Sequence, residues 1–299
     1  MMLAQPVHRH ECLKRMALLL ALLSSALVAQ ESAKPSYVPV VPVANMYRGP
    51  STDTDVVSQT IYGSLVTVVE VKADWANVKT FDNYTGWIQM AALRERTAPY
   101  AVNTPTVHVA QPSAHLYREP DVTAHAPLLT LPFDSRLEVL PSSNSTDRWL
   151  KVRLTDGGEA YVQAGDVSSD VTPLTIDQMI ALANKFLGVT YTWGGSSSFG
   201  FDCSGFTQTL VRQRGLIMPR DADVQAAWSG VVAVERKDLQ PGDLLFFGES
   251  ASHIKHTGMY IGNGEFIHDT THEHPGVQVS KLDEAPWTSL LVAARRVKS

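Results

Sequence analysis

The sequence has only two cysteines in 299 residues and no surplus of basic charge. Lysine and arginine total 25 against 30 aspartate and glutamate residues, which gives a formal net charge of -5 at pH 7. Nucleic-acid-binding domains usually carry a basic excess, so we expect no nucleic-acid partner. A hydrophobic content of 44% excludes an intrinsically disordered chain, and the length allows two or three domains.

The chain also has little sign of a membrane span. One apolar run near the start covers residues 16–29 and is interrupted only by two serines. A transmembrane helix needs about 20 apolar residues, whereas basic residues before a short apolar run and small residues after it indicate a secretory signal peptide. We therefore expect residues 1–29 to be a signal peptide, cleaved after Ala26 or Ala29. An uncleaved anchor and a true start at Met16 are the alternatives.

Export makes the cysteine count informative. Cys12 precedes the apolar run, so it would leave with the leader and is badly placed for lipid attachment. Cys203 is then the only thiol of the mature chain and has no partner for a disulfide. In an oxidising compartment a lone thiol is either buried or used chemically. We expect a periplasmic, extracellular or cell-wall-associated protein that keeps no membrane segment after signal cleavage.

Two β-rich segments follow a proline-containing linker at 30–43. Short runs of β-branched and aromatic residues alternate with turn residues over 44–98 and again over 104–170, which favours small all-β barrels. The strand beginning at Trp75 recurs at Trp149, 74 residues later. Self-similarity at a fixed spacing indicates a duplicated domain.

The pattern changes in the last segment, 172–299. Apolar residues at helical spacing predict a helix over 176–187, with Thr175 as its N-cap and Gly188 as its end. A second helix is predicted from about Cys203 to Arg214. Four strands are expected after the helices, at 244–247, 258–261, 265–268 and 290–296. Helices followed by antiparallel strands indicate an α+β domain.

Three residues of this segment have the pattern of nucleophilic catalysis. Cys203 begins an amphipathic helix, where the helix N-terminus and a nearby imidazolium would stabilise a thiolate and lower the thiol pKa. His256 and His268 lie on consecutive predicted strands joined by the turn 262–264. A nucleophile, a base and a group that orients the base form a triad, so these three are the candidate catalytic residues.

At this point the chain resembles a known family. Residues from about 172 to 297 resemble an NlpC/p60 peptidase domain, and the two preceding segments resemble bacterial SH3-like domains. The matching peptidase motifs are Tyr191-Thr192-Trp193-Gly194-Gly195, Asp202-Cys203-Ser204-Gly205, Pro219-Arg220-Asp221, Gln240-Pro241-Gly242-Asp243-Leu244 and His256-Thr257-Gly258-Met259-Tyr260. The domain order is similar to that of γ-D-glutamyl-L-diamino acid endopeptidases of the dipeptidyl-peptidase VI type. The resemblance implies an α+β, papain-like catalytic domain behind two small all-β SH3-like barrels.

The resemblance also assigns roles to the candidate residues. It implies that Cys203 attacks the γ-amide of D-glutamate in peptidoglycan stem peptides or muropeptide fragments, with His256 as general base and His268 as the orienting group. It places Asp202 and Ser204 in the substrate pocket. No metal or organic cofactor is implied.

More of the pocket follows from the same resemblance. Tyr191 and Trp193 line it, and it receives a free L-Ala amino terminus, an ammonium group for which a carboxylate such as Asp202 is suited. The first SH3-like domain walls it off with a tyrosine and an acidic residue, for which we take Tyr84 and Asp55. The subgroup often has serine after the Arg-Asp pair, whereas this sequence has Ala222. A hydroxyl contact is therefore lost there.

Each candidate also has a purely structural interpretation. Cys203 is compatible with an inert buried thiol. Tyr191 and Trp193 are compatible with core packing. Asp202 is a good helix cap, a role it can combine with substrate binding, and Tyr84 has the pattern of a turn aromatic.

His268 has competitors in its neighbourhood. His272 and His274 lie close by in the sequence and are alternatives for the third catalytic position. Together with Asp269 and Glu273 these histidines contain many metal-ligating atoms, but they lack a recognised ligand spacing and favour a solvated loop.

Two other functions remain open from the sequence. One is an enzyme of the same fold that cuts a different wall bond, as an amidase or a crosslink endopeptidase. The other is a non-catalytic cell-wall-binding protein in which the SH3-like pair carries the function.

Overall fold

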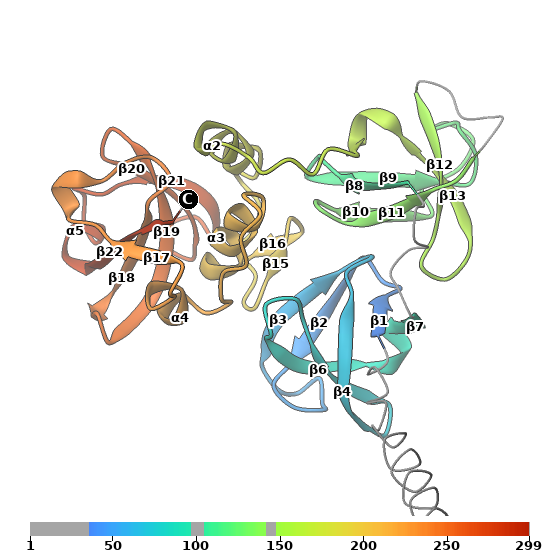
Figure 1. Cartoon of the computed structure of the whole chain (residues 1–299), viewed down its shortest axis with the longest axis horizontal. Coiled ribbons are helices and arrows are strands. Elements are labelled where there is room, and N and C mark those ends of the chain that lie inside the picture. Colours follow the sequence, from blue (N-terminus) through green and yellow to red (C-terminus); the bar gives the residue numbers. More distant parts are fainter. Residues whose placement is uncertain (1–35, 97–104, 142–147, 299) are drawn as a thin grey trace, which may run out of the picture. The chain divides into compact units, whose positions relative to one another are not determined.

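The computed structural model describes residues 36–96, 105–141 and 148–298, so the predicted signal peptide at 1–29 lies outside the described residues. Two regions built of strands and single 3-10 turns precede a region of mixed helices and strands (Figure 1). No helix in the described part is long and apolar enough to cross a membrane.

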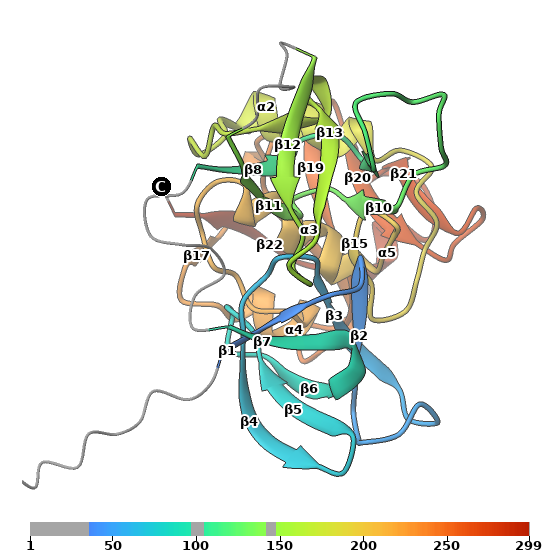
Figure 2. The same ribbon diagram turned by 90° about the vertical axis from the view of Figure 1, so that its right-hand side faces the viewer.

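The first region is a small barrel of seven strands in the order β3-β2-β6-β5-β4-β1-β7. Figure 2 shows β4, β5 and β6 side by side in it. Alternate residues of the strands point inward, and Met46, Val78 and Ile88 are buried in its core. The elements are β1 (Ser36–Pro39), β2 (Val43–Tyr47), β3 (Val56–Ile61), β4 (Val66–Lys72), β5 (Trp75–Lys79), β6 (Thr85–Gln89), the 3-10 turn η1 (Met90–Ala92) and β7 (Leu93–Arg96).

The second region repeats this topology strand for strand. Its order is β10-β9-β13-β12-β11-β8-β14, which is the first order with seven added to every strand number. The shared order confirms the duplication predicted from the repeat. The elements are β8 (Thr106–Val109), β9 (Ser113–Tyr117), β10 (Leu129–Pro132), β11 (Arg136–Val139), β12 (Trp149–Arg153), β13 (Glu159–Gln163), the 3-10 turn η2 (Ala164–Asp166) and β14 (Val167–Ser168).

The third region has a six-stranded antiparallel sheet in the order β17-β22-β18-β19-β20-β21, with a small hairpin beside it. The side chains of Phe206, Met259 and Ile267 share its main apolar core, which lies between the central helix and the sheet. The elements are α2 (Ile176–Lys185), β15 (Ser196–Ser197), β16 (Gly200–Phe201), α3 (Cys203–Arg212), α4 (Ala222–Ala226), β17 (Val231–Ala233), the 3-10 turn η3 (Arg236–Asp238), β18 (Leu244–Ser250), β19 (His253–Gly262), β20 (Glu265–Thr270), β21 (Gly276–Lys281), α5 (Trp287–Leu290) and β22 (Leu291–Val297).

The two long helices form where the sequence predicts them. Thr175 caps α2 and exchanges hydrogen bonds with Gln178 in a capping box, and Gly188 follows the helix with a φ of 84°. Helix α3 begins at Cys203 as predicted and ends at Arg212, two residues early. The elements α4, α5, β15, β16 and β17 were not predicted, because each is too short to show a clear periodicity. The six-residue strand β21 was also not predicted.

The first barrel also uses part of the segment predicted as a linker. Strand β1 lies within residues 30–43 and pairs with both β4 and β7. Tyr62, which follows β3, is buried in the apolar core of the second barrel, where its hydroxyl accepts a hydrogen bond from the Thr155 amide at 2.7 Å. The two barrels therefore share a buried contact.

A hairpin of the third region contacts both barrels. The Ser196 amide donates to Gln59 Oε1 of the first barrel at 3.0 Å. The Ser198 hydroxyl donates to the Pro112 carbonyl of the second barrel at 2.6 Å and accepts from the Phe133 amide at 2.9 Å. This hairpin, β15–β16, ends one residue before Asp202 and so leads directly into the start of α3.

Candidate active site

Cys203 occupies the first turn of α3, directly after the residue that caps this helix. The Asp202 carboxylate accepts a hydrogen bond from the Gly205 amide at 2.7 Å, which satisfies one of the free N–H groups of the helix start. Only 8% of Cys203 is exposed. The amides of Thr257, on β19, and Ser204 both act to lower the thiol pKa, so the thiol lies beside the strand residue that follows His256.

The thiol is neutral in this arrangement, contrary to the lowered pKa expected from its place at a helix start. Burial raises the pKa of Cys203 to about 12, and the neighbouring Asp202 charge adds to the rise. The Thr257 and Ser204 amides and Arg220 act in the opposite direction but do not outweigh desolvation.

The two predicted histidines meet on neighbouring strands. Nε2 of His256, on β19, lies 2.7 Å from Nδ1 of His268, on β20, and Nε2 of His268 lies 3.0 Å from Oγ of Ser280, on β21. Because Nε2 of His256 is hydrogen-bonded to His268, Nδ1 is the ring nitrogen of His256 that could accept a proton from the thiol. Burial lowers the pKa of His256 to about 4 and that of His268 well below its usual value, so both imidazoles are neutral.

This close pairing depends on a glycine. A Cβ at Gly258 would lie 2.9 Å from Cβ of His268 and 2.9 Å from the ring of Phe266. Any larger residue would push the two strands apart at the point where the histidines meet. The glycine of the His256-Thr257-Gly258 motif therefore has a packing role.

Aromatic side chains cover the histidine pair. The Trp287 ring, on α5, lies 5.3 Å from the His256 ring and 4.8 Å from the His268 ring, measured between centroids. Phe266 and Phe247 pack against the same imidazoles at 4.5 and 5.7 Å. These rings exclude water from the hydrogen bond between the histidines and strengthen it.

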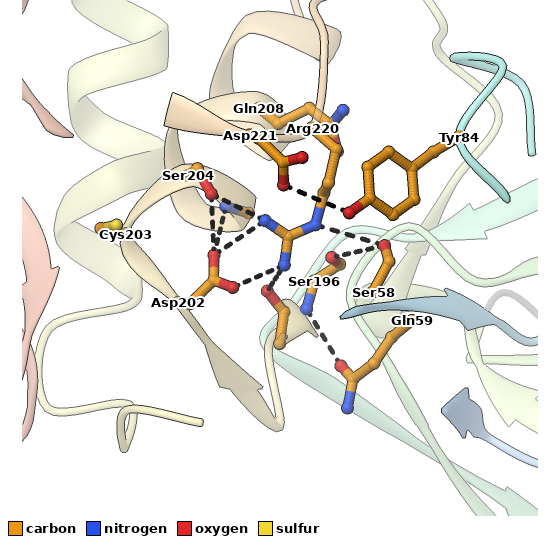
Figure 3. Close-up of polar contacts among 12 residues, drawn as sticks. Ser58, Gln59, Tyr84, Ser196, Asp202, Cys203, Ser204, Gln208, Arg220 and Asp221 are labelled. Carbon is orange, nitrogen blue, oxygen red and sulfur yellow. Dashed lines mark hydrogen bonds and ion pairs between the residues drawn. The ribbon is translucent and has the colours of Figure 1, made fainter. Parts of the chain in front are cut away.

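Arg220 is the centre of a buried polar network next to Cys203 (Figure 3). Its guanidinium binds both carboxylate oxygens of Asp202, at 2.9 and 2.6 Å, and also donates to Ser204 Oγ at 2.7 Å and to the Gly195 carbonyl at 3.2 Å. Its Nε donates to Ser58 Oγ of the first barrel at 3.2 Å. Arg220 is only 2% exposed, so its charge is stabilised by these partners alone.

The first barrel reaches the site through two more hydrogen bonds. The Tyr84 hydroxyl donates to Asp221 Oδ1 at 3.4 Å, and Gln208 of α3 donates to Asp82 Oδ2 at 2.8 Å. Figure 3 shows the Tyr84 ring directed at the Asp221 carboxylate. Burial and the Asp221 charge raise the pKa of Tyr84 to about 12, so its hydroxyl stays protonated.

A cavity of about 550 Å³ joins these groups. Six of the nine site residues predicted from sequence line it. Trp193 lies at its rim with 71% of its surface exposed, and Lys255 and Ile254 of β19 close another side. The lining residues are Arg48, Val56, Val57, Tyr84, Tyr191, Trp193, Gly194, Asp202, Cys203, Ser204, Arg220, Asp221, Ala222, Asp223, Ile254 and Lys255.

Three predicted residues lie outside this lining. His256 and His268 are not among the residues that line the cavity. Asp55 forms an exposed ion pair at 3.2 Å with Arg48, a lining residue, and so is one step removed from the cavity. The acidic lining residues Asp221 and Asp223 were not singled out as site residues. Asp221 belonged to a recognised motif, but its pairing with Tyr84 depends on the docking of the barrel, which no local pattern shows.

The described residues contain no group of three or more His, Cys, Asp or Glu side chains arranged to hold a metal ion. His272 and His274 were alternatives for the third catalytic position. His272 lies 5.5 Å from the Trp287 ring and 3.8 Å from Glu273, whereas His268 is the residue that bonds to His256.

Comparisons with known proteins agree with this geometry. The NlpC/P60 family profile matches residues 188–296, and the bacterial SH3 domain profile matches residues 42–94. A gamma-D-glutamyl-L-lysine dipeptidyl-peptidase of Bacillus cereus is 32% identical over 80% of this chain and 74% of its own length. The protein of the same name from Bacillus subtilis is 32% identical, over 83% of each chain.

A solved structure shows the same fold. The crystal structure of an NlpC/P60 family protein from Bacillus cereus superposes with a TM-score of 0.77 at 27% identity, over 88% of this chain and all of that one. Together with the sequence identity over most of both Bacillus proteins, this confirms the fold class and the enzyme class predicted from the sequence. The chain belongs to the NlpC/P60 family of cysteine peptidases.

Proposed function

We propose that this chain hydrolyses the γ-D-glutamyl–diamino acid bond of peptidoglycan stem peptides, and that it requires a free amino terminus on the L-Ala residue of the substrate. The observation that carries the proposal is the contact between Tyr84 of the first barrel and Asp221, both of which line the cavity that contains Cys203. A cavity walled on one side by a separate barrel favours short peptides over an intact wall. The names of the two Bacillus relatives support the same bond.

Asp221 is the carboxylate best suited to an ammonium group. Asp202 was our first candidate, but both of its oxygens already bind Arg220, which partly offsets its charge. Asp221 accepts one hydrogen bond, from Tyr84, and lines the cavity, so it retains lone pairs for a substrate amine. An acetylated amine would lose this charge pairing and meet the barrel wall.

The chemistry starts from a neutral pair. Because the pKa of Cys203 is raised and that of His256 is lowered, attack requires transfer of the thiol proton to Nδ1 of His256 as the sulfur bonds to the γ-carbonyl carbon. The imidazolium then donates its proton to the leaving amine of the diamino acid. Water activated by the same neutral imidazole hydrolyses the thioester and releases L-Ala-γ-D-Glu.

Two kinds of donor are available for the tetrahedral oxyanion. The Ser204 amide, in the first turn of α3, lies near enough to the sulfur to lower the thiol pKa, and Tyr191 lines the same cavity. Burial and the neighbouring Cys203 and Asp202 charges raise the pKa of Tyr191, so its hydroxyl remains protonated and able to donate.

The test is hydrolysis of L-Ala-γ-D-Glu-L-Lys and of its N-acetylated form, followed by mass spectrometry of the products. We expect release of L-Ala-γ-D-Glu from the free peptide, a loss of about 100-fold or more in kcat/KM on acetylation, and no turnover by Cys203→Ala. Cleavage of both peptides at equal rates would exclude the free-terminus requirement. Cleavage at a different bond would favour an amidase or crosslink endopeptidase.

We also propose that the protein is exported, on the basis of the leader pattern at 1–29 and a wall-derived substrate. Fusion of residues 1–29 to a reporter enzyme that is active only outside the cytoplasm tests the leader. Reporter activity that is lost when the apolar run is interrupted by arginines supports export. A fused reporter that stays inactive contradicts it.

A further inference from the structure

Nε2 of His268 bonds to Ser280, a residue that has no role in the mechanism proposed above. Strand β21 pairs with β20, and the side chain of Ser280 places its Oγ 3.0 Å from Nε2 of His268. His268 is fully buried, so each of its ring nitrogens depends on a protein group for its hydrogen bond.

The hydrogen bond between the histidines is compatible with two proton arrangements. In the first, His256 carries its proton on Nε2 and donates it to a bare Nδ1 of His268, which leaves Nδ1 of His256 free to accept the thiol proton. In the second, His268 carries its proton on Nδ1 and donates it to His256, whose own proton must then sit on Nδ1. The second arrangement offers Cys203 an N–H group where catalysis needs a base.

Ser280 supplies the acceptor that the first arrangement needs. The first requires a proton on Nε2 of His268, and Ser280 Oγ lies where it can accept that proton. A hydroxyl can accept or donate, so the half-buried Ser280 can also donate to a bare Nε2 in the second arrangement; the need for a base at Nδ1 of His256 is what selects the first. In the first arrangement every ring nitrogen of His268 has a complementary partner.

The same arrangement serves both halves of the reaction. When His256 becomes an imidazolium it keeps its Nε2 proton and still donates to His268. His268 itself stays neutral, since burial and the neighbouring His256 and His272 all lower its pKa. The other residues packed on it, Phe266 and Trp287, bring no charge. No ring has to rotate between the steps.

We propose that Ser280 is a positioning residue, which holds His268 in the Nε2–H tautomer and thereby leaves Nδ1 of His256 free to act as the base. This proposal rests on the catalytic roles proposed above for Cys203 and His256. Ser280 touches neither the cavity nor the thiol, so it should affect kcat and leave KM unchanged.

The test compares Ser280→Ala, which removes the acceptor, with Ser280→Thr, which keeps it. We expect Ser280→Ala to lower kcat by about 10- to 100-fold with KM within about twofold of wild type, and Ser280→Thr to recover most of the loss. Ser113→Ala, which changes an exposed strand serine of the second barrel, is the matched control and should leave kcat unchanged.

Two further measurements separate positioning from damage to the fold. Iodoacetamide alkylation of Cys203 at pH 7 needs no peptide substrate, and it should slow in Ser280→Ala and recover in Ser280→Thr. Imidazole ¹⁵N chemical shifts should show the Nε2–H tautomer of His268 in the wild type and a mixture of tautomers in Ser280→Ala.

A double-mutant cycle gives the sharpest outcome. Asparagine at position 268 has no ring tautomer, so Ser280→Ala should have no further effect on kcat in the His268→Asn background. The proposal is overturned if Ser280→Ala keeps full kcat, if Ser280→Thr is as slow as Ser280→Ala, or if the losses of the two sites multiply. Failure of the proposed function would show separately, as full activity of Cys203→Ala or cleavage of another bond.

Discussion

Arg220 and Asp202, the residue before Cys203, form a buried bidentate ion pair with nitrogen–oxygen distances of 2.9 and 2.6 Å. The same carboxylate caps the helix that begins at Cys203. The pair therefore links the wall of the cavity, the helix start and, through Ser58, the first barrel. It also sets the charge that the thiol experiences, because Arg220 offsets the effect of Asp202 on the Cys203 pKa.

Removing the guanidinium should affect both stability and the thiol. Arg220→Met leaves Asp202 buried and unpaired, which costs about 3–5 kcal/mol of unfolding free energy. If the variant folds, the Cys203 pKa should rise further, because the opposing charge is gone. Urea denaturation and the pH dependence of alkylation measure the two effects. The control is Arg48→Met, whose exposed pair with Asp55 should contribute about 1 kcal/mol or less.

The amine subsite should respond to changes at Asp221 and Tyr84. Asp221→Asn removes the charge that we assign to the substrate ammonium, so kcat/KM for the free peptide should fall by about 10- to 100-fold. The slow cleavage of the acetylated peptide should not change. Tyr84→Phe removes the hydrogen bond to Asp221 and should raise KM with kcat nearly unchanged. Tyr161→Phe, in the second barrel, should match the wild type. Equal losses on both peptides would argue for a structural role.

Activity should persist to a pH well below the usual pKa of histidine, and the acid limb of the pH profile should start there. The pKa of His256 is lowered to about 4, so the imidazole stays neutral and competent as pH falls past 6.5. We expect kcat/KM to be lost as pH falls through about 4 to 5, measured as a pH profile in the free enzyme. Trp287→Leu admits water to the ring and should move this limb upward, toward 6.5. A wild-type limb near 6.5 would contradict the buried neutral imidazole.

Asp269 should lower the free energy of unfolding at neutral pH. Its carboxyl is fully buried, and within the described residues neither oxygen has a hydrogen-bond partner. Burial, and then the Asp202 charge, raises its pKa from 3.8 to about 8. Between these values the unfolded chain releases this proton and the folded chain keeps it, so the Asp269 contribution to stability falls as pH rises.

Asp269→Asn removes this penalty. We expect the variant to gain about 1–3 kcal/mol of unfolding free energy at pH 7, and to lose the gain as pH falls toward 4, where both states of the wild type hold the proton. Urea denaturation at several pH values measures the difference. Asp283→Asn, on an exposed loop, is the control and should show no such trend. A gain that does not vary with pH would point to packing instead.

Local patterns were enough to predict that Cys203 starts a helix and that His256 and His268 lie on adjacent strands. Cys203 begins a helix whose cap and apolar stripe are visible in the sequence, and His256 and His268 lie on adjacent strands joined by a short turn. The direction of the Cys203 pKa was wrong, since helix-start chemistry is readable from sequence but the degree of burial is not.

What the sequence did not show lies across element or domain boundaries. Ser280 meets His268 only because β21 pairs with β20 in one particular register. Asp221 meets Tyr84 through a contact between residues 137 positions apart in the chain. Asp55 was chosen by analogy as the acidic wall residue, whereas the structure pairs it with Arg48 and brings Asp221 to Tyr84 instead.

The hairpin β15–β16 has a consequence for how such a protein can evolve. Its residues Ser196 and Ser198 bond to different barrels, and its second strand ends just before the helix cap that holds the nucleophile. Deleting either barrel would leave one of these serines without its barrel partner, a few residues from Cys203. A transplant of this chain's peptidase region alone would therefore leave unpaired polar groups close to Cys203, and we expect such a transplant to need changes in this hairpin.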